Sequence, residues 1–152
     1  ELMSFFLDVC KSYVVQAFCQ TLPFEKEKIV KVEWLTQLTS MWINSQKDHE
    51  YFPIHIHDGH LSSVMYLKIP EYLPNRKVYK YDEHTDGAIT FTNNASIDKT
   101  WGSPTLTIQP EVGDFYLFPS DLFHCVYPFY TKGERRSFSV NLNFLEMPHN
   151  ET

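Results

Sequence analysis

The sequence predicts a mainly β protein of one domain, a closed β-sandwich or jelly roll with one or two N-terminal helices packed on its outside. Three observations predict this fold. Twelve Phe and nine Tyr but only five Gly occur in the chain, a balance that favours tightly packed strands. Short apolar runs alternate with turn-forming segments over most of the chain. The 152 residues suit a single domain, 1–152, with a substantial core.

The chain begins with a predicted helix over about residues 2–19. Its apolar residues recur at steps of three and four, the period of an amphipathic helix whose apolar face lies against a sheet. They are Leu2, Phe5, Phe6, Val9, Cys10, Tyr13, Val14, Ala17 and Phe18. Pro23 and the charged residues 25–28 follow, and we therefore place the jelly-roll core at about residues 31–146.

The core begins with residues 31–44, which are rich in β-branched and aromatic residues and predict one long strand. Trp34 and Trp42 are expected to pack within the core. Shorter predicted strands follow at 54–56, 61–69, 88–92, 105–109, 115–118, 122–127 and 136–145. The segments between them are rich in Pro, Gly, Asn and Asp, the residues of turns.

The last strand has an unusually clear alternation. Its apolar face carries Phe138, Val140, Leu142 and Phe144, and its polar face carries Arg135, Ser137, Ser139, Asn141 and Asn143. Side chains alternate between the two faces of a strand, so we expect the apolar set to be buried against a helix or a second sheet. The polar face either meets solvent or lines a barrel whose interior holds something hydrophilic.

Charge and composition exclude several classes of function. The net charge is −6, and no cluster of basic residues is denser than Arg135-Arg136, so nucleic acid is not an expected partner. No apolar run approaches the roughly 20 residues that span a bilayer, and we expect a cytoplasmic protein. Cys10, Cys19 and Cys125 are expected to be reduced thiols. Because the chain begins with Glu1, it is open whether it is a fragment.

Residues 52–60 place three of the seven histidines close together. His55 and His57 are two residues apart, so on a strand both side chains would project from one face, as two ligands of one metal must. Imidazole suits Fe, Zn, Cu or Ni. A His-x-His pattern alone is equally typical of surface or hydrogen-bonded histidines.

A fourth histidine, His124, follows a Pro-Ser-Asp turn within an apolar strand. A lone histidine in such a strand is most often a hydrogen-bonded core residue. Its spacing of eleven residues to Arg135 favours a functional role.

Taken together, four segments resemble the dioxygenases that depend on Fe(II) and 2-oxoglutarate. They are the His-x-His pair, Leu-Ser-Ser-Val-Met-Tyr-Leu at 61–67, the run from Glu-Val-Gly-Asp at 111–114 through Phe-Pro-Ser at 118–120 to His124, and Glu-Arg-Arg-Ser-Phe-Ser-Val-Asn at 134–141. They are most similar to the prolyl-4-hydroxylase-like branch, and within it to small oxygenases of the kind encoded by phages, which would work in the host cytoplasm. The resemblance covers roughly residues 42–144.

This resemblance implies a double-stranded β-helix of the cupin-like jelly-roll type, with a metal centre inside it. His55 and His57 match the paired metal ligands of the family, and His124 matches the distal histidine. The implied metal is Fe(II), held at the mouth of the barrel.

The resemblance also implies a site for the co-substrate 2-oxoglutarate. Arg135 matches the arginine that binds the far carboxylate, and a guanidinium supplies charge and fixed orientation together. Tyr66 matches the tyrosine that hydrogen-bonds the same carboxylate. Ser137 and Ser139 lie on the same face of the strand as Arg135 and complete the implied site.

One departure from the family pattern concerns the metal ligands. The family has His-x-Asp where this chain has His55-x-His57, so three neutral ligands replace two neutral ligands and a carboxylate. Asp58 is an alternative ligand, although it should point to the opposite face of a continuous strand. His60 is expected in a loop or as a hydrogen-bonding partner of the site.

The implied activity is hydroxylation of a C–H bond with O2 and 2-oxoglutarate, which yields succinate and CO2. A peptidyl proline is the first candidate for the second substrate, and the oligomeric state is open. The alternative is a non-catalytic cupin-like metal-binding or structural protein, because barrels of this shape host many functions. Metal content would separate the two.

Overall fold

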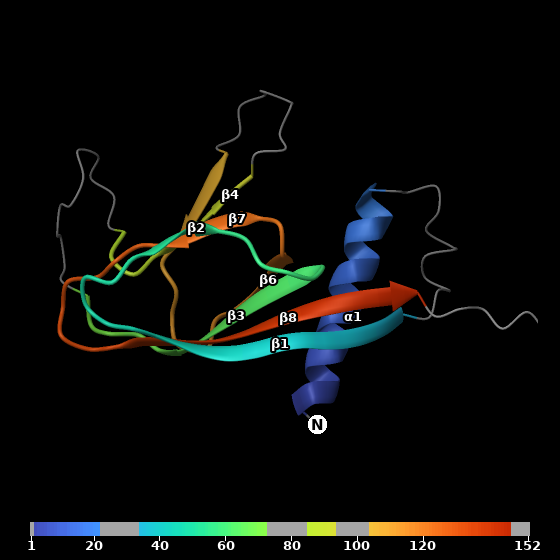
Figure 1. Ribbon diagram of the computed structural model, residues 1–152, viewed down its shortest axis with the longest axis horizontal. Coiled ribbons are helices and arrows are strands. Elements are labelled where there is room, and N and C mark those ends of the chain that lie inside the picture. The colour runs from blue at the N-terminus through green and yellow to red at the C-terminus, as the bar shows by residue number, and fades with distance from the viewer. Residues whose placement is uncertain (1, 22–33, 73–84, 94–103, 147–152) are drawn as a thin grey trace, which may run out of the picture.

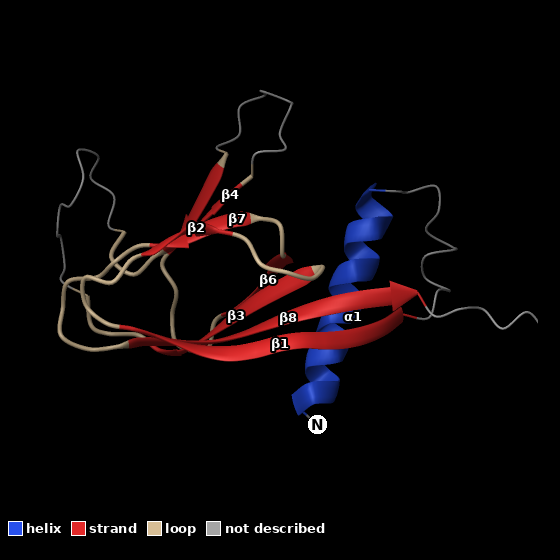
Figure 2. Ribbon diagram, viewed as in Figure 1, coloured by secondary structure: helices blue, strands red, loops and turns tan. Residues whose placement is uncertain are grey.

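The computed structural model describes residues 2–21, 34–72, 85–93 and 104–146. Within these ranges one helix precedes eight strands (Figures 1 and 2). The elements are α1 (Leu2–Thr21), β1 (Trp34–Gln46), β2 (Phe52–His55), β3 (Leu61–Lys68), β4 (Ile89–Thr92), β5 (Thr105–Ile108), β6 (Phe115–Pro119), β7 (Phe123–Val126) and β8 (Arg135–Glu146). The fold is mainly β, as predicted.

The strands form two four-stranded antiparallel sheets. The first sheet has the order β1-β8-β3-β6 and the second has the order β2-β7-β4-β5. Figure 1 shows the second sheet lying over the first. Because the chain passes repeatedly from one sheet to the other, the two sheets are held together by their connections as well as by packing, which confirms the predicted jelly roll.

The elements differ from their predicted bounds mainly at the ends. The first strand continues to Gln46, two residues beyond the prediction, and α1 continues to Thr21. Residues 31–33, which we placed in the first strand, and residues 22–30 before them lie outside the described part of the chain. None of the described helices is long and apolar enough to cross a bilayer.

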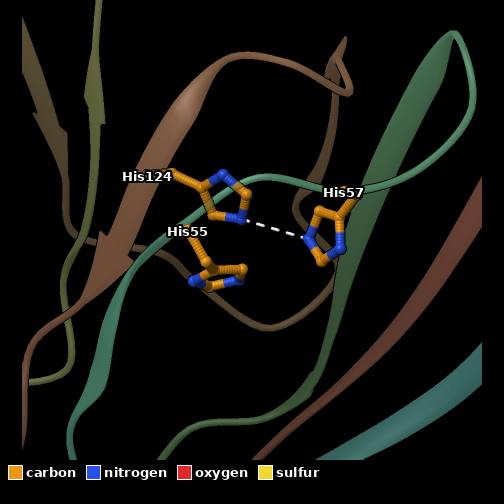
Figure 3. Close-up of side chains that lie close together, drawn as sticks. All are labelled: His55, His57 and His124. Atoms are coloured by element: carbon orange, nitrogen blue, oxygen red, sulfur yellow. Dashed lines mark hydrogen bonds between the residues drawn. The ribbon is translucent and has the colours of Figure 1, made fainter.

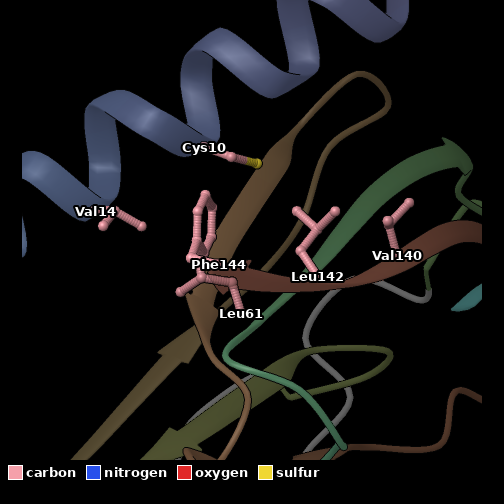
Figure 4. Close-up of a cluster of buried hydrophobic side chains, with 6 residues drawn as sticks. All are labelled: Cys10, Val14, Leu61, Val140, Leu142 and Phe144. Carbon is pink, nitrogen blue, oxygen red and sulfur yellow. The ribbon is translucent and has the colours of Figure 1, made fainter. Parts of the chain in front are cut away.

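The outer face of the first sheet carries an apolar core, against α1 (Figure 4). Val140, Leu142 and Phe144 of β8 are buried together with Cys10 and Val14 of α1. Leu61 completes the cluster, and Phe138 packs against it while staying partly exposed. The prediction for the apolar face of β8 is therefore confirmed.

The polar face of β8 is also buried. Arg135, Ser137, Ser139 and Asn141 are each at most 5% exposed. This face turns inward with Val64 and Tyr66, which belong to a second apolar cluster shared by the two sheets. The interpretation in which the polar face meets solvent is wrong. The polar face instead lines a hydrophilic interior between the two sheets.

Two of the three cysteines can be assigned. Cys10 and Cys125 are free thiols, and burial raises the pKa of both. Cys10 acts as a small apolar side chain in the core beneath α1, as expected for a reduced cysteine. The side chain of Cys19 lies outside the described residues.

We predict that Leu142→Ala lowers the free energy of unfolding by about 2–5 kcal/mol, because it leaves a cavity between β8 and α1. Leu142 is 1% exposed, whereas Leu145 on the same strand is 44% exposed. Leu145→Ala is thus a matched control that should cost less than about 1 kcal/mol. Urea denaturation measures both, and equal losses would contradict the assigned core.

Candidate metal and co-substrate site

Three histidine side chains converge between the two sheets (Figure 3). One ring nitrogen from each of His55, His57 and His124 lies within 4.8 Å of the other two. The Nε2 atoms of His57 and His124 are 3.2 Å apart, and two ligands at right angles on a metal with bonds of about 2.1 Å would be about 3 Å apart. The His57–His124 pair therefore has the spacing of two ligands of one metal, and His55 lies close enough to join them as a third.

His55 and His124 are positioned by strand pairing. His55 ends β2 and lies directly opposite His124 of β7 in the antiparallel register. Directly opposed side chains project from the same face of a sheet. The pairing of two short strands thus brings together two histidines that are 69 residues apart in the sequence.

His57 reaches the same point by a different route from the one predicted. Because β2 ends at His55, His57 does not share a strand face with it, and the reason we gave for their convergence is wrong. The His57 backbone N–H donates to the Ser120 carbonyl at 2.8 Å. The His57 ring packs against Trp42, with ring centroids 5.3 Å apart.

Hydrogen bonds define the tautomers of two of the rings. Nδ1 of His55 lies 2.6 Å from the Pro53 carbonyl oxygen, and Nδ1 of His124 lies 2.9 Å from that of Leu122. A carbonyl oxygen only accepts, so both Nδ1 atoms carry the proton, which leaves the Nε2 lone pairs available to a metal.

The environment of His57 and His124 favours their uncharged form. Burial, followed by the neighbouring His124 and His55, lowers the pKa of His57 to about 4. Burial also lowers the pKa of His124. Near pH 7 both rings are therefore neutral, which is the form that binds metals.

Arg135 lies buried between the sheets at the start of β8, and only 2% of it is exposed. Its Nη2 donates to the Tyr66 hydroxyl at 2.9 Å, and its Nη1 lies 3.5 Å from Oε1 of Gln46. Its Nε has no hydrogen-bond partner among the described residues. Burial lowers its pKa, and no carboxylate of the described residues forms an ion pair with it. A buried guanidinium in this state leaves part of its charge and hydrogen-bonding capacity unsatisfied.

Glu134, which precedes Arg135 in the sequence, pairs with residues other than Arg135. Glu134 accepts hydrogen bonds from Ser45 and from Arg136, whose Nη2 lies 2.9 Å from Oε1. Lys68 adds an ion pair at 3.6 Å. Arg136 is exposed on the opposite face of the strand from Arg135, as the alternation predicts.

The histidine triad and Arg135 line one cavity. Its empty volume is about 430 Å³, counting its open mouth. Ser137 and Ser139 line it, and apolar side chains such as Phe52, Ile89 and Phe118 cover another part of its wall. None of the described residues that line it is acidic.

Other residues near the cavity were missed or misjudged from the sequence. Gln46 is fully buried beside Arg135, Asn44 lines the cavity, and Trp42 contacts His57 instead of lying in the apolar core. All three lie on β1 opposite the polar face of β8. Their spacing of two residues is the signal that could have identified them.

Asp58 and His60 do not join the triad. The Asp58 side chain is exposed and is outside the cluster, so His57 holds the place that the carboxylate alternative would have taken. Nδ1 of His60 accepts a hydrogen bond from the Phe144 backbone N–H at 3.0 Å. His60 therefore links its loop to β8.

Comparison with known proteins places these features in a family. A family model described as "Putative 2OG-Fe(II) oxygenase" matches residues 40–141. No curated protein sequence is significantly similar to the chain. Among solved structures, the chain is similar to an oxidoreductase of the 2OG-Fe(II) oxygenase family from Burkholderia pseudomallei, with 15% identity and a TM-score of 0.52 over 79% of this chain and 50% of that one.

A prolyl-4-hydroxylase from Pseudomonas putida is also similar, with 15% identity and a TM-score of 0.47 over 88% of this chain and 66% of that one. The chain thus spans about half the length of the Burkholderia protein and about two thirds of the Pseudomonas protein. The likeness to the Burkholderia protein supports the fold. The family match covers about two thirds of the 152 residues, including the triad and Arg135, and the chain belongs to the 2OG-Fe(II) oxygenase family.

Proposed function

We propose that the cavity binds Fe(II) and 2-oxoglutarate and that the protein hydroxylates a C–H bond of a second substrate. The observation that carries this proposal is the buried Arg135 in the same cavity as the histidine triad, with no carboxylate partner in the described part of the chain. When bound, the iron and 2-oxoglutarate would supply the oxidising chemistry, in which O2 is consumed and 2-oxoglutarate becomes succinate and CO2. The protein supplies binding and orientation.

The triad suits a metal that accepts imidazole ligands and keeps open positions. Neutral imidazole is a ligand for Fe, Zn, Cu and Ni. Three protein ligands leave further positions for a co-substrate and O2. His55, His57 and His124 would hold the metal, and the carbonyl partners of His55 and His124 would keep their rings in the ligating tautomer.

Arg135 and Tyr66 would bind the far carboxylate of 2-oxoglutarate. An unpaired guanidinium between two sheets costs several kcal/mol unless an anion joins it. The Tyr66 hydroxyl accepts from Arg135, and burial raises its pKa. It therefore keeps its own proton, which it can donate to the same carboxylate. Ser137 and Ser139 add hydroxyl groups on the same wall.

The rest of the cavity wall would limit the access of water. Phe52, Ile89 and Phe118 present apolar surface to the cavity. A dry wall strengthens the charged contacts inside the cavity. A peptidyl proline is the first candidate for the hydroxylated substrate, on the basis of the sequence resemblance to the prolyl-4-hydroxylase-like branch.

We predict that His124→Ala weakens Mn²⁺ binding by more than about 100-fold, because it removes a metal ligand. Loss of a residue that only hydrogen-bonds a ligand typically weakens metal binding by roughly 10- to 100-fold. Calorimetric titration with Mn²⁺ measures the change. His60→Ala, which removes a histidine outside the triad, is the control and should bind Mn²⁺ like the wild type. Wild-type affinity in the His124 variant would remove the triad as the metal site.

We predict that Arg135→Ala weakens 2-oxoglutarate binding to the Mn²⁺-loaded protein at least about thirtyfold, the equivalent of roughly 2 kcal/mol for one half of a buried charge pair. Binding of Mn²⁺ alone should be retained. Arg136→Ala removes the neighbouring, exposed guanidinium and should leave 2-oxoglutarate affinity unchanged. If the wild type shows no affinity for 2-oxoglutarate, the non-catalytic metal-binding alternative is favoured.

A further inference from the structure

We propose that the metal and 2-oxoglutarate bind this protein as a cooperative pair, each weakly without the other, because the co-substrate and not a protein carboxylate supplies the negative charge that the metal needs. The inference rests on the proposed function and concerns the regulation of the same site. It follows from the charges of the side chains that line the cavity.

Among the described residues that line the cavity, Arg135 carries a positive charge and none carries a negative one. The converging ligands are three imidazoles, and no Asp or Glu occurs among the described residues that line the cavity. Arg135 lines the same cavity and is 2% exposed. The neighbouring Glu134 is paired with Arg136 and Lys68, so its charge is largely compensated outside the cavity.

A divalent metal alone would raise the charge of this poorly solvated cavity from +1 to +3. Like charges in a medium of reduced dielectric repel each other strongly, so metal binding is opposed by Arg135. The two carboxylates of 2-oxoglutarate bring −2, which leaves +1. Each ligand therefore improves the electrostatic environment of the other, and by linkage the improvement is reciprocal.

His57 is the residue that makes the protein's own ligand set neutral. Its Nε2 lies 3.2 Å from that of His124, so it occupies a position in the triad that a carboxylate would hold in the family's His-x-Asp pattern. His57→Asp would place a negative charge among the ligands. The metal would then depend less on 2-oxoglutarate for its charge balance.

The test measures the Kd of Mn²⁺ from the electron paramagnetic resonance signal of the free ion, with and without saturating 2-oxoglutarate. In the wild type, 2-oxoglutarate should lower the Kd of Mn²⁺ by roughly 5- to 150-fold, the usual range of coupled sites. In His57→Asp, the Kd without 2-oxoglutarate should be lower than in the wild type, and the ratio should shrink. His49→Asp makes the same change on an exposed histidine with φ 64°, which Asp tolerates, and should keep the wild-type ratio.

A second measurement on the wild type covers the case in which His57→Asp does not fold. 2-Oxovalerate has the same chain as 2-oxoglutarate but lacks the far carboxylate, so it should lower the Kd of Mn²⁺ by a smaller factor. Equal factors for the two ligands would mean that chelation alone governs the affinity, and would overturn the inference.

The remaining outcomes separate this inference from the proposed function. If 2-oxoglutarate binds the Mn²⁺-loaded protein but leaves the Kd of Mn²⁺ unchanged, the cooperative pair is rejected and the proposed function stands. A wild-type ratio that persists in a folded His57→Asp variant also rejects it. If 2-oxoglutarate does not bind at any Mn²⁺ concentration, the proposed function fails together with the inference.

Discussion

The burial of both faces of β8 is the constraint on which the rest of the structure depends. Leu142 and its apolar neighbours pack under α1, while Arg135 and the two serines on its face line the cavity. A shift of register by one residue would exchange the two faces and would put the guanidinium against the helix. Packing of the apolar core against α1 therefore fixes the position of Arg135. The helix does not need to contact the cavity residues to do so.

The triad depends on a local arrangement that occurs twice. In both His55 and His124, Nδ1 bonds the carbonyl oxygen two residues earlier in the chain. The two strands that carry them pair directly, so one strand pair sets both the positions and the tautomers of two rings. His57 lacks this arrangement and is held by its backbone bond to Ser120 and by the Trp42 ring.

Features governed by local periodicity could be predicted from the sequence, and features governed by distant contacts could not. The alternation of β8 gave its two faces correctly, and the apolar period of α1 gave a buried Cys10 and Val14. The end of β2 at His55 was missed, because the pairing of β2 with β7, which is distant in the sequence, defines the strand. Gln46 and Asn44 were missed although their spacing of two residues puts them on one face of β1, because the pairing of β1 with β8 is what shows that this face turns inward.

The chemical character of the cavity follows from what alternation keeps out of it. Glu134 and Arg136 flank Arg135 in the sequence and pair with each other through the hydrogen bonds of Glu134. Glu134 therefore pairs with cations outside the cavity, although it is adjacent to Arg135 in the sequence. With neutral imidazoles as the converging ligands, the cavity keeps its positive charge. A buried positive charge of this kind selects an anion, and the same three strands β1, β3 and β8 that bury Arg135 supply the hydroxyl and amide groups that would orient it.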